Sequence, residues 1–116
     1  MAIAQNGLER ALDLLLADMD FVAVGTGANT PLISNTQLQE EVRRDSVANV
    51  FRQGNVVYVK ALIPNTGLPA ITREVGLFLD ATSSPNNGDM LVRSLNQFIK
   101  GSADLVVTFE ITLSEA

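Results

Sequence analysis

Apolar and polar residues alternate most regularly near the end of the chain, after Asp104. Five apolar residues fall on one side of an extended strand: Leu105, Val107, Phe109, Ile111 and Leu113. Because every second side chain of a strand points the same way, we expect this side to face a core.

Further segments rich in β-branched residues are predicted as strands, namely residues 21–24, 45–53, 56–63, 70–80 and 90–95. Gly54 and Asn55 are typical of a two-residue hairpin turn between two of them. Gly76 interrupts the fourth segment, and a glycine inside a strand indicates a bulge or a close backbone approach.

Two segments have helical rather than alternating spacing. Leucines recur every three or four residues from Leu8 to Leu16, which predicts an amphipathic helix over about residues 7–17, with Asn6 as its cap. A trimeric coiled coil is the alternative, but ten residues supply too few heptads. Ser34 followed by Gln37 predicts a second, short helix that ends near Val42. The fold class is therefore α+β, mainly β: an antiparallel β-sandwich with an amino-terminal helix and a second short helix in one domain, residues 1–116.

Composition removes several classes of function. The chain has no cysteine and no histidine, so thiolate sites, imidazole bases and imidazole metal ligands are excluded. Its net charge of −5 disfavours binding to nucleic acid. No apolar segment is long enough to span a membrane, and the first seven residues do not resemble a secretory signal.

Two loops contain residue types that also occur in binding sites. Gly25-Thr26-Gly27 lacks the lysine or third glycine of phosphate-binding loops, which favours a simple turn. Asn86-Asn87-Gly88-Asp89 could coordinate calcium, but the same residues form tight turns. Because no opposed pair of carboxylates is evident either, we expect no enzymatic activity, no metal and no cofactor.

Charged pairs occur at two places in the apolar pattern. Arg43 and Arg44 adjoin two glutamates, and local ion pairing on a solvated face is the simplest interpretation. Arg73 and Glu74 lie inside a predicted strand, so they should point outward, pair with neighbouring charges or contact a partner subunit.

The order of these features resembles the amino-terminal domain of phage tail-collar fibre proteins and related small phage tail proteins. Gly7-Leu8 opens the first helix, and Val24-Gly25-Thr26-Gly27 ends the first strand. The signature I-R-E-x-G-L-F is approximated by residues 71–78. The residues that carry the resemblance and that we expect to have structural roles are Gly25, Gly27, Arg44, Glu74, Gly76, Leu77, Phe78, Lys100 and Gly101.

The resemblance implies a structural protein of a bacteriophage tail, baseplate or fibre attachment, made in the host bacterial cytoplasm and incorporated into the virion. It implies contacts with other virion proteins and a homo-oligomer, as a symmetric ring or a trimer. Fibre proteins continue into a receptor-binding shaft, whereas this sequence stops at Ala116, so we expect an attachment module without the fibre. The alternatives are a capsid decoration protein and, less favoured, a calcium-dependent hydrolase.

The expected partner surface is the loop Thr30-Pro31-Leu32-Ile33, together with Arg73 and Glu74. Leu32 and Ile33 are apolar residues in a connection where polar residues are usual. Two interpretations are open: both side chains contact a partner, or both pack on the core beneath the second helix.

Overall fold

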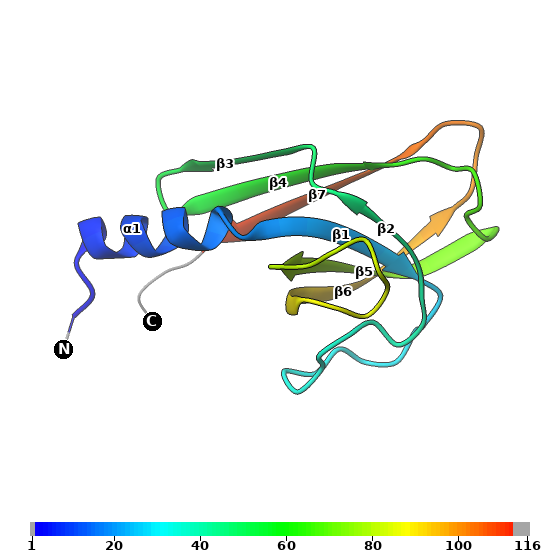
Figure 1. Cartoon of the computed structure of the whole chain (residues 1–116), viewed down its shortest axis with the longest axis horizontal. Coiled ribbons are helices and arrows are strands. Elements are labelled where there is room, and N and C mark those ends of the chain that lie inside the picture. Colours follow the sequence, from blue (N-terminus) through cyan, green and yellow to red (C-terminus); the bar gives the residue numbers. More distant parts are fainter. Residues whose placement is uncertain (1, 113–116) are drawn as a thin grey trace.

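The computed structural model describes residues 2–112. Its elements, in chain order, are α1 (Gln5–Leu16), β1 (Met19–Gly25), β2 (Glu41–Ser46), β3 (Asn49–Gln53), β4 (Val56–Ile63), β5 (Ile71–Leu79), β6 (Asp89–Ile99) and β7 (Leu105–Thr112). The strands form two antiparallel sheets, ordered β2-β1-β5-β6 and β3-β4-β7. Figure 1 shows the sheets as two layers, with α1 extending from one end. The predicted mainly β fold with an amino-terminal helix is confirmed.

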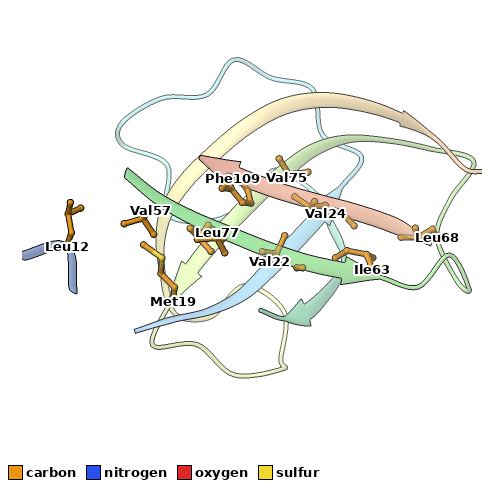
Figure 2. Packing of buried hydrophobic residues seen from close by; sticks show 13 residues of the cluster. Leu12, Met19, Val22, Val24, Val57, Ile63, Leu68, Val75, Leu77 and Phe109 are labelled. Carbon is orange, nitrogen blue, oxygen red and sulfur yellow. The ribbon is translucent and has the colours of Figure 1, made fainter. Parts of the chain in front are cut away.

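Aliphatic side chains from both sheets form the core. Val22 and Leu77 from the first sheet pack with Val57, Ile63 and Phe109 from the second. In Figure 2 these side chains point into the space between the two layers. The expected burial of the last strand is confirmed where it is described: Val107 and Phe109 are buried, while Leu105 and Ile111 are half-buried against the core. Leu113 lies outside the described residues.

Helix α1 covers one end of the core. Leu8 and Leu12 are buried, as their spacing predicted. The predicted cap is wrong: Asn6 lies inside the helix, and Ala4 is the N-cap without a side-chain hydrogen bond. Arg52 of β3 pairs with Asp13 at 2.6 Å, and this hydrogen bond holds the pKa of Asp13 below its ordinary value.

The segment predicted as one strand over residues 45–53 is in fact two strands in different sheets. The chain changes sheets at Val47 and Ala48. The Val47 N–H donates to Asp20 O at the end of β1, and the Ala48 N–H donates to Lys60 O in β4. Both sheets bury aliphatic side chains, so the hydrophobic pattern along the sequence continues where the chain passes from one sheet to the other.

The second predicted helix, over residues 34–42, is wrong. Asn35 forms a tight turn with Leu32, and the chain then runs without a helix into β2. The N–H groups of Gln39 and Glu40 donate to the Glu74 carboxylate, 2.8 and 2.9 Å away, rather than to a helical turn. A contact with a distant residue therefore overrides the local capping signal.

Gly76 is a point of close approach, as predicted. A Cβ at this position would lie 2.9 Å from Leu38 Cδ2 and 3.1 Å from the Phe78 ring. Leu38, Phe78 and Ala23 form a second buried cluster on the outer face of the β2-β1-β5-β6 sheet. The loop of residues 26–40 therefore packs on that face by placing Leu38 over Gly76.

Substitution Gly76→Val should lower the free energy of unfolding by about 1–3 kcal/mol, the usual cost of overpacking. Urea denaturation measures the change. Gly101→Val is the matched control, because a Cβ there meets nothing within 4 Å. Equal stability of the Gly76 variant and the wild type would show that the Leu38 contact is not tight.

Candidate functional site

A buried carboxylate anchors the loop of residues 26–40, hereafter the anchored loop. The Glu74 side chain is fully buried in β5. It accepts hydrogen bonds from the backbone N–H groups of Gly27 (2.7 Å), Gln39 (2.8 Å) and Glu40 (2.9 Å). One side chain therefore binds both ends of the loop, which lies beside the sheet in Figure 1.

Arg93 of β6 neutralises this carboxylate and extends the network into the loop. Its Nε donates to Glu74 Oε1 at 3.0 Å, and its side chain is 3% exposed. Its Nη atoms donate to Asn29 O and Oδ1 at 3.1 and 2.6 Å, and to Asn35 Oδ1 at 3.4 Å. Because an unpaired buried charge is costly, the ion pair and the loop conformation depend on each other.

Two glycines, one directly before the anchored loop and one near its start, leave room for the carboxylate. A Cβ at Gly25 would lie 2.6 Å from Glu74 Oε2, and one at Gly27 would lie 2.5 Å from the same atom. A Cβ at Gly25 would also overlap Glu40 O. The Gly25-Thr26-Gly27 segment is therefore a turn that closes around Glu74.

A second buried ion pair lies on the same outer face of the sheet, on β2 at the opposite edge from β6. Arg44 Nε is 2.8 Å from Glu41 Oε2, and both side chains are at most 2% exposed. The guanidinium stacks over the Phe78 ring, 4.5 Å from its centre. The prediction that Arg44 pairs with a neighbouring glutamate is confirmed. The prediction that this pair lies on a solvated face is wrong, because the Phe78 ring and the neighbouring turn cover it.

The loop at residues 86–89 is a turn held by Arg44. Asn86 and Gly88 have φ values of 59° and 82°. Arg44 Nη1 donates to Asn87 O at 3.1 Å, and the Thr82 N–H donates to Asn87 Oδ1 at 2.8 Å. Arg44 and Thr82 therefore fix both the main chain and the side chain of Asn87 in this turn. Within residues 2–112, no group of three or more acidic, His or Cys side chains is placed to hold a metal.

The tip of the anchored loop exposes apolar side chains. Leu32 is 61% exposed and Ile33 is as exposed as in an extended chain. Asn35 N donates to Leu32 O at 3.0 Å, and Leu32 N donates to Asn35 Oδ1 at 2.9 Å, so Ile33 occupies the tip of a turn. The core interpretation of these two residues is wrong. Thr30 is exposed and Pro31 is half-exposed beside them.

The remaining predicted site residues divide between surface and core. Arg73 is exposed, as expected. Glu74 is buried within the chain, so its prediction as a partner contact is corrected to an internal anchor. Leu77 belongs to the main core. Lys100 and Gly101 lie away from the loop: Lys100 Nζ donates to Leu68 O at 3.2 Å, and Gly101 O accepts from Asn65 Nδ2 at 2.8 Å.

Sequence reasoning missed Arg93, although the sequence contains a signal for it. Arg93 is the single charged residue between Met90 and Ile99, and β6 has one other charge, Asp89, at its first residue. A lone charge in one apolar strand and Glu74 in another favour a buried pair. The hydrogen bonds that Asn29 and Gln39 form in the anchored loop could not be predicted in the same way, because such polar residues are usual in any turn.

Comparison with known proteins gives no identification. No protein-family model matches the sequence, and no curated protein matches it. None of the helices described for residues 2–112 is long and apolar enough to cross a membrane. The fold and the anchored loop are therefore the basis for a functional assignment.

Proposed function

We propose that this chain is a structural component of a bacteriophage virion, in the tail, baseplate or fibre attachment, and acts through contacts with other virion proteins. The supporting observation is that five of the nine residues that carry the resemblance lie in the anchored loop, directly before it or against it. They are Gly25, Gly27, Glu74, Gly76 and Phe78. Residues as far apart in the sequence as Gly27 and Glu74 are thus combined in one structural unit that fixes a surface loop.

The design of that loop favours binding over catalysis. A buried ion pair and three backbone hydrogen bonds hold both ends in place. Binding by a loop that is already ordered loses less conformational entropy than binding by a flexible one. The ordered tip carries Leu32 and Ile33, which are unfavourable in water and suited to the centre of a protein interface.

The distribution of charge along the chain also favours a protein as the partner of the loop. Residues 26–39 contain no charged side chain, although the whole chain has a net charge of −5. A neutral apolar tip has no affinity for phosphate backbones, and it can approach an acidic protein without repulsion. The loop therefore fits a protein partner, and we assign it as the contact surface in the particle.

Charged substitutions at the tip should prevent incorporation into particles. For Leu32→Glu and Ile33→Glu, we expect a folded domain and an on the order of tenfold or greater loss of incorporation, as for truncation of an interface hot spot. Particles assembled with each variant are purified, and the amount of this chain per particle is measured by quantitative mass spectrometry. The control is Leu14→Glu on α1, where the leucine is 65% exposed and lies outside the anchored loop.

Unchanged incorporation of both tip variants would contradict the assignment of the loop. Absence of the wild-type chain from purified particles would contradict the virion role itself. Unfolding of a tip variant, seen by circular dichroism, would contradict the exposed position of the tip.

A further inference from the structure

A pocket at the β6–β7 turn is a second feature that the fold does not explain. It has a volume of about 290 Å³ and opens where the β4–β5 and β6–β7 connections meet. Leu68 and Thr72 are buried at its floor, whereas Ile99 and Ala103 are exposed at its mouth. Phe98 and Leu105 add apolar walls.

The floor of this pocket contains an unsatisfied polar atom. Thr72 is 2% exposed, and its Oγ1 has no hydrogen-bond partner within the described chain. The oxygen is closed off from solvent, so the pocket offers an occupant apolar walls over a buried polar floor rather than a hydrogen bond. Apolar side chains on an exposed loop suit such a pocket.

The anchored loop has the complementary properties. Its tip presents Ile33, fully exposed on a tight turn, with Leu32 beside it. Of the residues that line the pocket, only Lys100 and Asp104 are charged, with opposite signs. A neutral loop can therefore enter a neutral pocket, which avoids the repulsion that two chains of charge −5 would meet at most other contacts.

One chain cannot bring its own loop to its own pocket. Figure 1 shows the loop (cyan) below the sheets, whereas the β6–β7 turn (orange) is at the upper right. The hydrogen bonds of Glu74 and Arg93 keep the loop on the outer face of its sheet. An occupant of this kind must come from another molecule.

We propose that the tip of the anchored loop inserts Ile33 into the pocket of a second copy of this chain, which joins copies head to tail. Such a contact uses two different surfaces, so it leaves one loop and one pocket free in every dimer. Successive additions close into a ring when the rotation between copies permits it and otherwise form an open chain. This inference depends on the proposed function in one respect: it takes the anchored loop as the binding surface.

Head-to-tail contact has a specific test by complementation. Ile33→Glu removes the inserted side chain but retains the pocket, and Ala103→Trp fills the pocket mouth but retains the loop. Each variant alone should be monomeric in sedimentation velocity over the micromolar range, where the wild type forms oligomers. An equal mixture of the two should form a one-to-one dimer and nothing larger, because only one productive contact remains.

Controls separate this contact from other association. Leu14→Glu should sediment like the wild type, and Ser102→Trp should reproduce the effect of Ala103→Trp. Circular dichroism checks that each variant is folded. For the mixed pair, adding Ile33→Glu to the Ala103→Trp component removes the one remaining productive loop and should weaken binding by on the order of tenfold or more.

A wild-type chain that stays monomeric at every concentration would overturn the proposal, as would a mixture that forms no dimer. Oligomers of Ile33→Glu alone, or equal disruption by Leu14→Glu, would place the contact elsewhere and overturn it too. If the wild type is monomeric but Ile33→Glu still prevents incorporation into particles, the loop binds a different virion protein. The head-to-tail contact then fails and the proposed function stands.

Discussion

Replacement of Glu74 by Ala should lower the free energy of unfolding by about 3–5 kcal/mol, the range for removing one partner of a buried ion pair. The substitution leaves the Arg93 guanidinium buried without a counter-ion. It also leaves the N–H groups of Gly27, Gln39 and Glu40 without an acceptor. Urea denaturation followed by circular dichroism measures the loss.

Two comparisons make this prediction specific. Glu110→Ala removes an exposed carboxylate from β7 and should change stability by less than about 0.5 kcal/mol. The double variant Glu74→Leu, Arg93→Met should lose less than the sum of the single variants, because no unpaired charge remains. A Glu74→Ala variant within about 1 kcal/mol of the wild type would contradict the anchoring role, given the range cited for buried pairs.

Replacement of Phe109 by Ala should also cost about 3–5 kcal/mol, as for a large side chain removed from a core. Phe109 is 8% exposed and packs in the cluster between the sheets (Figure 2). Val106→Ala, on the same strand, is the control: Val106 is 49% exposed, and the loss should be within about 0.5 kcal/mol. Equal denaturation midpoints for the Phe109 and Val106 variants would show that the buried side of β7 is assigned wrongly.

The strands were largely predictable because their signal is local. The alternation in β7 and the turn at Gly54-Asn55 each depend on neighbouring residues, and the structure confirms both. Alternation does not say which sheet a strand joins. For that reason the change of sheet at Val47 and Ala48 was missed, since it depends on hydrogen bonds to β1 and β4.

The candidate site was less predictable because long-range contacts determine it. Ser34 and Gln37 have the spacing of a helix start, yet Glu74 binds the N–H groups that such a helix would use. Glu74 was expected to point outward, to pair with a neighbouring charge or to contact a partner. The structure shows a charge pair with Arg93, but a fully buried one, and that burial was not predicted. The exposure of Leu32 and Ile33 was one of two open interpretations, and it follows from the anchored ends of the loop rather than from the tip sequence.

Cryo-electron microscopy of the intact particle tests the virion role most directly. We expect density for the two sheets and α1 in repeated copies in the tail, baseplate or fibre attachment, with Leu32 and Ile33 covered by a neighbouring protein. Purified particles with no density for this fold in any part would contradict the role, and density on the capsid surface would contradict its place in the tail.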